Sequence, residues 1–558
     1  VAAHLPCGKE GPMIHSGAVI GALASRLGAR IGKDEWSVDL EERDFIAAGA
    51  SAGVAAAFGA PLGGVLFALE EGASFWGAEV LLRSFLCASV SALTLNFLLV
   101  GTNGVMSWGS LGSLGVLTFG SSLENDTTSY RIWELPIFVA MGAVGGLLGA
   151  LFNTLNTRLT LWRMRLIGPR GRRRFLEALF VAAVSAGAFF LVPLATNSCF
   201  VPSVDSSHDH SWISCEPRGQ GGGVSGAVGL FIAPGEDSIK VLLHDPVAFD
   251  AGLLAGVAGL YFCMACWTYG LGVPSGLFVP GLLLGSVLGR LWGQLLRQAL
   301  GLELIIPGSY ALIGAAASLA GTARITISLA VILVEATGNT QWCLPVLFTV
   351  LAARCVGDLF NESIYDIHIG LKRHPLLPES PDEDHGRMRV GDAMAQHPVV
   401  LEQKVLVRDL VATLEQTSHH GFPVVEPGTG RLLGLAQRGM LQQLLLRGGE
   451  CGAFREQGAA GEPAGRVPSG PLAGCPKLED ALRALTPSDL LLELDLGPYV
   501  DGGAPTVQEA ASLRRAYALF RGLGLRHLPV VRRDGCVLGV LTRKDLLLAP
   551  PDASARGA

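Results

Sequence analysis

Long apolar runs, several of them close to 20 residues, are the feature that most restricts how this chain can fold. A helix needs about 20 apolar residues to cross a bilayer, so the runs predict a polytopic membrane domain rather than a large soluble helical core. Glycine or proline interrupts many runs, and broken helices are tolerated at membrane depth only inside protein or beside a watery cavity. This pattern favours a channel or transporter over a simple anchor. The runs span residues 12–31, 44–74, 78–100, 134–157, 176–195, 250–272, 276–299, 309–335 and 343–360.

The composition supports this interpretation and excludes several other classes. Hydrophobic residues make up 50% and charged residues 16% of the 558 residues, whereas charged residues are about 25% of a typical soluble domain. A disordered chain, a collagen and a coiled coil are therefore excluded. The net charge of −6 argues against a nucleic-acid partner. We expect no enzyme, because no nucleophile–base pair and no Cys/His cluster with zinc spacing stands out in the sequence.

Residues 1–372 are predicted to form the membrane domain, with a polar loop at 196–247 between membrane segments. Two later stretches repeat one another. Each has an amphipathic helix, a strand containing Pro-Val-Val, a turn, a second strand and a final helix. The predicted boundaries are a linker at 373–392, the first repeat at 393–447, a flexible linker and connecting segment at 448–497, the second repeat at 498–549 and a tail at 550–558.

The apolar region also contains an internal repeat. The segments Gly8–Pro12 and Gly276–Pro280 share the form G-x-x-x-P, and each opens an apolar run. The segments 49–70 and 314–335 each begin with a small-residue motif, GASAG or GAAAS, and each ends on a glutamate 21 residues later. Two matched halves with interrupted helices predict a substrate site at their interface.

The first G-x-x-x-P segment, Gly8-Lys9-Glu10-Gly11-Pro12, has the residues of an anion site. Proline suits the first turn of a helix, and the glycines allow a ligand to approach the backbone closely. A helix N-terminus offers unpaired N–H donors and a partial positive charge, so it attracts anions. Glu10 is therefore a candidate tethered anion whose protonation releases the site. The alternative is an ordinary capped helix with a solvated glutamate.

The second segment supplies the matching half without a charged side chain. An anion there would be held by the backbone N–H groups of Leu277, Phe278 and Val279. The alternative is an apolar loop before a buried helix.

Glu70 and Glu71 end the apolar run GGVLFALEE, and a carboxylate inside lipid is costly enough to be a functional candidate by default. A solvated pair at the membrane face is the alternative. Tyr365, at the end of the last apolar stretch, offers a phenolic O–H donor. A purely structural tyrosine is the alternative there.

Together, GKEGPMIHSG, GAPLGGVLFALEEGASFW, ACWTYG, VPSGLFVP and IYDIHIG, followed by the two repeats, resemble the CLC chloride channels and chloride/proton antiporters. The similarity is strongest to the antiporters of late endosomes and lysosomes. It implies a mostly α polytopic membrane protein, built from inverted repeats of broken helices, followed by a cytosolic α/β pair of CBS domains. It also implies a homodimer in membrane lipid, in a late endosomal, lysosomal or vacuolar membrane, with a small glycosylated accessory subunit as a further expected partner.

The resemblance also implies residue roles. Glu10 matches the gating glutamate, and Glu71 matches the internal proton glutamate that channel members typically lack. The family's chloride positions correspond here to Lys9, Glu10, Gly11, Leu277, Phe278 and Tyr365. The implied activity is exchange of two chlorides for one proton.

The CBS pair of this family can bind ATP as a regulatory nucleotide that is not hydrolysed. By resemblance, His419, His420, Gly421 and Phe422 lie where relatives contact the adenine, and Asp545 matches the carboxylate that takes the ribose hydroxyls. ATP or another adenine nucleotide is therefore the expected regulatory ligand, beside chloride as the transported ion.

Three other functions stay open at this point. The first is a passive voltage-gated chloride channel on the same fold, against which the pair of Glu10 and Glu71 argues. The second is a CBS-regulated transporter of divalent cations, which would need more carboxylates inside the membrane region. The third is a truncated isoform without transport. We expect the natural N-terminus to lie upstream of Val1, together with the family motif that separates chloride from nitrate preference.

Overall fold

The computed structural model describes residues 5–30, 39–73, 77–102, 130–168, 171–195, 199–200, 214–215, 223–231, 234–244, 249–301, 305–372, 374, 376–377, 381, 384–447, 453–455, 478–500 and 502–547. The chain divides into two compact units. The first consists of Val1–Ala22 and Asp44–Arg373, and the second of Leu23–Arg43 and His374–Ala558.

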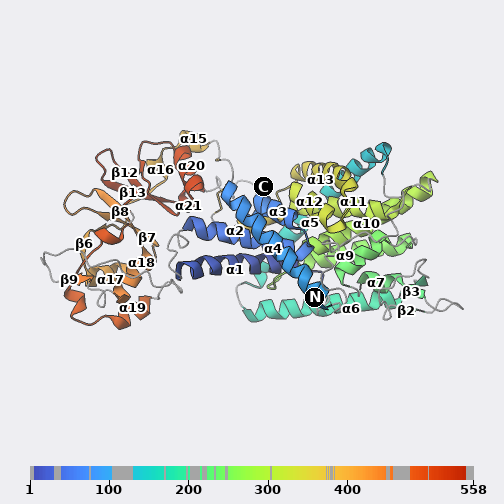
Figure 1. The fold of residues 1–558 in the computed structure, drawn as a ribbon, viewed down its shortest axis with the longest axis horizontal. Coiled ribbons are helices and arrows are strands. Elements are labelled where there is room, and N and C mark those ends of the chain that lie inside the picture. Colours follow the sequence, from blue (N-terminus) through green and yellow to red (C-terminus); the bar gives the residue numbers. More distant parts are fainter. Residues whose placement is uncertain are drawn as a thin grey trace. The chain divides into compact units, whose positions relative to one another are not determined.

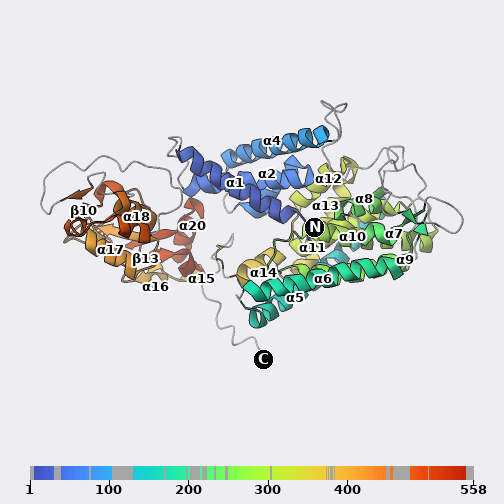
Figure 2. The ribbon, with the colours of Figure 1, turned by 90° about the horizontal axis from the view of Figure 1, so that it is seen from below.

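The first unit is almost entirely helical (Figure 1). Within its described residues, six helical segments are long and apolar enough to cross a membrane, which agrees with the predicted membrane domain. Figure 2 shows α4 and α6 at opposite edges of this unit. The helices are α1 (Glu10–Arg30), α2 (Asp39–Phe58), α3 (Pro61–Phe67), α4 (Ala78–Thr102), α5 (Leu135–Leu166), α6 (Gly171–Ala195), α7 (Gly226–Phe231), α8 (Gly235–His244), α9 (Ala251–Thr268), α10 (Phe278–Leu300), α11 (Pro307–Ala323), α12 (Ile327–Thr337), α13 (Cys343–Asp358) and α14 (Ile364–Leu371), with a π-helical turn at Ala68–Gly72 and short 3₁₀ turns at Ile132–Glu134 and Thr340–Trp342.

Two of the nine predicted runs, 44–74 and 309–335, are each split into two helices at equivalent points of the internal repeat. Gly59 follows α2 with a φ of 66°, and Arg324 follows α11 with a φ of 64°. Each of these residues comes ten positions after the start of its small-residue motif. Glycine adopts this left-handed conformation without steric cost. The two halves of the repeat therefore share a backbone break as well as a sequence pattern.

Arg324 needs side-chain contacts to hold the same conformation, because a left-handed φ is uncommon for a residue with a Cβ. Its Nη2 donates to Asn361 Oδ1 at 2.9 Å, and its Nε lies 3.4 Å from Asp358 Oδ1. The guanidinium is buried, so these contacts also offset part of the free-energy cost of desolvating its charge.

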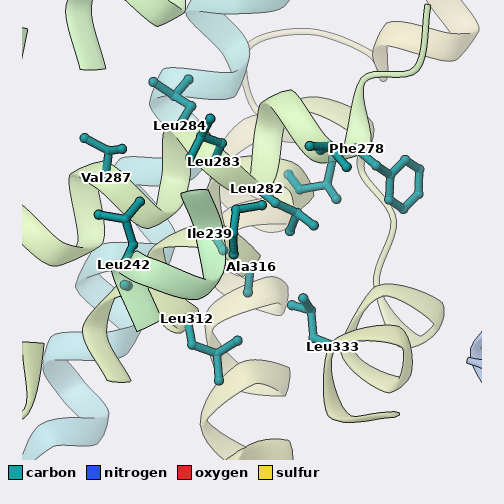
Figure 3. Close-up of a cluster of buried hydrophobic side chains, with 14 of the residues drawn as sticks. Ile239, Leu242, Phe278, Leu282, Leu283, Leu284, Val287, Leu312, Ala316 and Leu333 are labelled. Atoms are coloured by element: carbon teal, nitrogen blue, oxygen red, sulfur yellow. The ribbon is translucent and has the colours of Figure 1, made fainter. Parts of the chain in front are cut away.

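The prediction of a polar loop at 196–247 is partly wrong, because this segment contains α7, α8 and three short strands. These are β1 (Cys199–Phe200), β2 (Ser214–Cys215) and β3 (Gly223–Ser225), paired in the order β1-β3-β2. The amphipathic α8 buries Ile239 and Leu242 against α10 and α11. Figure 3 shows these side chains grouped with Leu282 and Val287 of α10 and with others of the same core. Charged residues on the outer face of α8 hide this apolar face from a composition-based prediction.

Glycines allow α5 and α11 to pack in direct backbone contact. A Cβ at Gly149 would overlap the carbonyl group of Gly321, and a Cβ at Gly321 would overlap the carbonyl oxygen of Gly145. Such close approach lets van der Waals packing hold helices together in lipid, where no hydrophobic force acts between them. The crossing fixes α11, which carries the second small-residue motif.

The second unit is the predicted α/β pair. Its strands are β4 (Ala395–Gln396), β5 (Leu401–Glu402), β6 (Lys404–Leu406), β7 (Gly421–Val425), β8 (Leu432–Gln437), β9 (Phe454–Arg455), β10 (Glu493–Asp495), β11 (Val507–Gln508), β12 (His527–Val531) and β13 (Val537–Thr542). Its helices are α15 (Asp384–Arg387), α16 (Val390–Ala393), α17 (Val407–Gln416), α18 (Arg438–Arg447), α19 (Leu478–Ala484), α20 (Leu513–Leu523) and α21 (Arg543–Leu546), with 3₁₀ turns at Asp489–Leu491 and Gly497–Tyr499.

The strands of the second unit form sheets in the orders β5-β7-β8, β11-β12-β13-β4 and β6-β10-β9. In each repeat a short strand pairs in parallel with the Pro-Val-Val strand, which pairs in turn with an antiparallel neighbour. Parts of the segment 448–497 belong to the first repeat rather than to a flexible linker. Ala481, Leu494 and Leu496 are fully buried in the core that also contains Leu410.

The two repeats of the second unit meet through reciprocal backbone contacts. Leu432 N–H donates to the Gly535 carbonyl at 3.0 Å, and Val537 N–H donates to the Gly430 carbonyl at 3.2 Å. The two donors, Leu432 and Val537, occupy equivalent positions in the two repeats. The two acceptors, Gly535 and Gly430, are likewise equivalent. This arrangement has the local symmetry of a two-fold axis.

We predict that Gly149→Ala lowers the free energy of unfolding by about 1–3 kcal/mol, because the added methyl group forces α5 and α11 apart. Thermal melting of the detergent-solubilised protein measures the effect. Gly259→Ala in α9 is the matched control, because a Cβ there has no neighbour within 4 Å. Equal melting temperatures for the two variants would contradict the role of the crossing.

Candidate functional site

The two G-x-x-x-P segments, which open α1 and α10, lie against each other. Gly8 N–H donates to the Gly276 carbonyl at 2.9 Å, and Gly276 N–H donates to the Gly8 carbonyl at 3.0 Å. The bridge is antiparallel, so equivalent residues of the two halves face each other in opposite directions. The two segments predicted to meet at the interface between the halves are thus in direct contact.

Glu10 is fully buried at this interface. Its Oε1 accepts the Val279 N–H at 2.5 Å, and its Oε2 has no hydrogen-bond partner among the described residues. A Cβ at Gly8 or at Gly276 would overlap this carboxylate. Both glycines are therefore required for the side chain to reach the N-terminus of α10.

The Glu10 carboxylate occupies the position where a helix N-terminus attracts an anion. Leu277, Phe278 and Val279 are all buried, and the Phe278 ring packs against those of Phe58 and Phe67 at centroid distances of 5.4 and 5.8 Å. Low polarity strengthens the attraction between an anion and the Val279 N–H. The structure assigns a contact with the carboxylate to Val279, while chloride binding by Leu277 and Phe278 stays a prediction.

Tyr365 lies near both candidate carboxylates. Glu10, Glu71 and Tyr269 are all close enough to its phenol group to influence it electrostatically. Tyr365 is half-buried against the core of the first unit. The structure thus brings Tyr365 near both Glu10 and Glu71, as the sequence interpretation requires, and its contact with chloride stays a prediction.

The helix that carries Tyr365, α14, is held by a side-chain network that the sequence interpretation missed. His368 Nε2 lies 3.0 Å from Asn156 Oδ1, and the His368 ring packs edge-on against Tyr269. Asn156 Nδ2 in turn donates to the carbonyls of Cys266 and Tyr269. One asparagine in α5 therefore ties the end of α9 to α14.

Glu70 and Glu71 have different surroundings although they are adjacent. Glu70 accepts four hydrogen bonds, two from Thr326 (backbone 2.7 Å, hydroxyl 2.5 Å) and two from Ser328 (backbone 3.1 Å, hydroxyl 2.6 Å). It therefore caps the N-terminus of α12, and Arg354 lies 3.6 Å away. Glu71 is exposed on the π-helical turn. Of the two candidates, Glu70 is a structural cap and Glu71 is the carboxylate left available for chemistry.

The glutamate at the equivalent position of the other half, Glu335, makes the reciprocal cap. Its Oε2 accepts the Gly63 N–H at 2.7 Å and its Oε1 accepts the Leu62 N–H at 3.2 Å, at the start of α3. Each half thus places a carboxylate on the helix N-terminus of the other. The 21-residue spacing that the two halves share is the sequence signal of this exchange.

Lys9 forms an ion pair with Glu236 in the first turn of α8, with Nζ 2.8 Å from Oε1. Sequence reasoning missed Glu236, because it lies within the segment interpreted as a polar loop. Gly11 lies against Gly276, so a Cβ at Gly11 would approach the Gly276 Cα closely. Chloride binding by Lys9 and Gly11 stays a prediction.

The candidate nucleotide residues lie in the second unit. His419 and His420 are exposed just before β7, whereas the Phe422 side chain is fully buried and packs edge-on with the His419 ring. Gly421 lies against the His527 ring, which occupies the equivalent repeat position. The buried Phe422 ring is therefore not available to stack on a base.

Asp545 uses Oδ2 to accept the backbone N–H and the hydroxyl of Thr542, both at 2.7 Å, and so caps α21. Within the part of the chain that the structure describes, no hydrogen bond joins Asp545 to His419 or His420. The nucleotide site stays a prediction.

We predict that Glu70→Ala lowers the free energy of unfolding by about 2 kcal/mol, because the variant leaves the N-terminus of α12 uncapped. Glu71→Ala is the matched control and should leave the melting temperature of the detergent-solubilised protein unchanged. Equal destabilisation by the two variants would contradict the assignment of the cap to Glu70.

Comparison with known proteins places the chain in one family. A family model described as voltage gated chloride channel matches residues 1–358, and a CBS domain model matches residues 501–552. The chain is 40% identical over 578 residues to the H(+)/Cl(-) exchange transporter 7 of Homo sapiens, covering 97% of this chain and 68% of the relative. It is 33% identical over 583 residues to chloride channel protein CLC-d of Arabidopsis thaliana, covering 98% and 72%. A solved structure of a eukaryotic CLC transporter matches with a TM-score of 0.60 and 25% identity, covering 97% of this chain and 77% of that one. The chain therefore belongs to the voltage gated chloride channel (CLC) family and carries a CBS domain.

Proposed function

We propose that this protein exchanges chloride for protons across a membrane, two chlorides against one proton. The observation that carries the proposal is the Glu10 carboxylate on the N-terminus of α10, hydrogen-bonded to Val279 N–H at 2.5 Å. A carboxylate held where an anion binds competes with chloride for the same donor. The name of the human relative, H(+)/Cl(-) exchange transporter 7, supports this proposal.

The proposed cycle follows from this competition. Ionised Glu10 occupies the N-terminus of α10, and protonation removes the charge that holds it there. The neutral side chain leaves and chloride takes its place at the backbone donors. In this cycle Glu71 supplies or accepts the proton, and its proximity to Tyr365, which also lies near Glu10, supports that role. Proton and chloride movements are coupled because one helix N-terminus serves both anions.

The protein is further proposed to act as a homodimer in the membrane of late endosomes, lysosomes or vacuoles, with the CBS domains in the cytosol. Apolar side chains on the outer faces of α4 and α13 support contact with lipid or a second copy, for example Leu86, Phe97, Phe348 and Leu351, all more than 40% exposed. A small glycosylated accessory subunit belongs to the same proposal.

We also propose that an adenine nucleotide regulates transport at the CBS domains. The exposed His419 and His420 support this, because an imidazole ring can stack on a base. The backbone of Gly421 and Phe422 would line the adenine, and the free Oδ1 of Asp545 would accept the ribose hydroxyls. The nucleotide would bind without hydrolysis.

Coupled flux in proteoliposomes tests the antiporter proposal. A chloride gradient imposed at equal pH should drive protons uphill in the wild-type protein. Glu71→Ala should abolish proton movement while chloride flux continues, because the second proton carrier is lost. Glu10→Gln should also uncouple the two ions, because glutamine never takes up the proton.

Glu362→Gln is the control for these variants, because this exposed glutamate lies outside the site. Chloride flux without any proton movement in the wild-type protein would contradict exchange and leave a passive channel. Continued proton coupling in Glu71→Ala would contradict the role of Glu71.

Calorimetric titration with ATP tests the regulatory proposal. Asp545→Asn keeps an acceptor for the Thr542 cap but removes the charge, so ATP binding should weaken about tenfold. Asp409→Asn on the exposed face of α17 is the matched control. Undetectable binding of ATP to the wild-type protein would contradict the nucleotide proposal and leave the transport proposal untouched.

A further inference from the structure

The ion pair of Lys9 and Glu236 lies beside Glu10. Lys9 directly precedes Glu10, and its Nζ lies 2.8 Å from Glu236 Oε1. The Lys9 side chain is 43% exposed and that of Glu236 is 26% exposed. Exposed ion pairs contribute little to folding stability, so an effect on the neighbouring site is the main consequence to consider.

Glu236 is held close to the donor that binds Glu10. Gly235, its neighbour in the first turn of α8, lies so close to Val279 that a Cβ there would touch Val279 Cγ1. α8 packs along α10, and Ser238 Oγ anchors its first turn by donating to the Gly229 carbonyl at 3.0 Å. The pair therefore links the first G-x-x-x-P segment, through Lys9, to α8, which packs against Val279 and α10.

Both charges of the pair act on the Glu10 carboxylate, and they act in opposite directions. Lys9 favours the ionised form and Glu236 disfavours it, so the two charges of the intact pair oppose each other at Glu10. Other titratable groups nearby are Tyr261 and Tyr365, which lie close to Glu10, and Cys7, which lies close to Tyr261. These three are neutral in their ordinary states, so the ion pair supplies the nearest fixed charges.

We propose that Lys9 and Glu236 form a charge-balanced pair that sets the pH range in which Glu10 yields its place to chloride. This inference rests on the proposed exchange function and assigns Glu236 as a positioning residue for it. The pair acts on Glu10 through space and through the placement of α8 against Val279. Loss of one partner leaves the charge of the other uncompensated beside the carboxylate.

Transport measured in proteoliposomes at equal pH on both sides tests the proposal over a series of pH values. Glu236→Gln leaves Lys9 unopposed and keeps Glu10 ionised, so half-maximal transport should move to lower pH by about half a unit or more. Lys9→Gln should move it to higher pH by a similar amount. The double variant should return close to the wild-type value.

Two controls separate this effect from local damage. Asp237→Asn makes the same change of charge on the same helix, but Asp237 pairs with Lys240 rather than with Lys9, so it should cause little shift. In a Glu10→Gln background, the shifts caused by Glu236→Gln and Lys9→Gln should disappear.

The outcomes distinguish this proposal from the function on which it rests. Absence of proton-coupled transport in the wild-type protein would overturn the proposed function itself. Normal coupled transport combined with shifts in the same direction for both single variants, or with no shift, would overturn the role of the pair. Opposite shifts that persist in the Glu10→Gln background would overturn the assignment of Glu10 as the group affected.

Discussion

The meeting of two helix N-termini at the bridge between Gly8 and Gly276 is the contact on which the rest of the site depends. It brings unpaired N–H groups into a buried, largely apolar place, where an unsatisfied donor is costly. A hydrogen-bond acceptor is therefore needed there, and in this structure the Glu10 carboxylate accepts the Val279 N–H. In the proposed exchange, this tethered and titratable carboxylate links proton uptake to chloride binding.

Reciprocal contacts between the two halves also occur away from this site. Glu70 caps α12 and Glu335 caps α3, so each half completes a helix of the other. The breaks at Gly59 and Arg324 place the short helices so that these caps can form. In the second unit, the backbone bonds from Leu432 to Gly535 and from Val537 to Gly430 are likewise reciprocal. Reciprocal bonding between repeats is thus how both units join their halves.

The sequence predicted the membrane helices, the internal repeat, the α/β pair and the place of Glu10 at a helix N-terminus. These features leave local patterns of run length, spacing and glycine or proline content. The partners Glu236 and Asn156 were not predictable, because they are distant in sequence from the residues they contact and no motif marks their segments. Glu70 and Glu71 also could not be separated, since the choice between cap and free carboxylate depends on the three-dimensional position of α12. The amphipathic α8 was missed because charged residues share its segment.

The reciprocal caps also have a mechanical consequence. Movement of α3 or α12 alone would break the hydrogen bonds between a carboxylate and the backbone donors it caps, so we expect the two short helices to move together as one rigid body. Any rearrangement during a transport cycle would then move both helices at once. The Glu10 side chain lies outside these caps and accepts the Val279 N–H. In the proposed cycle it is therefore the part that moves, while the capped helices form a fixed frame.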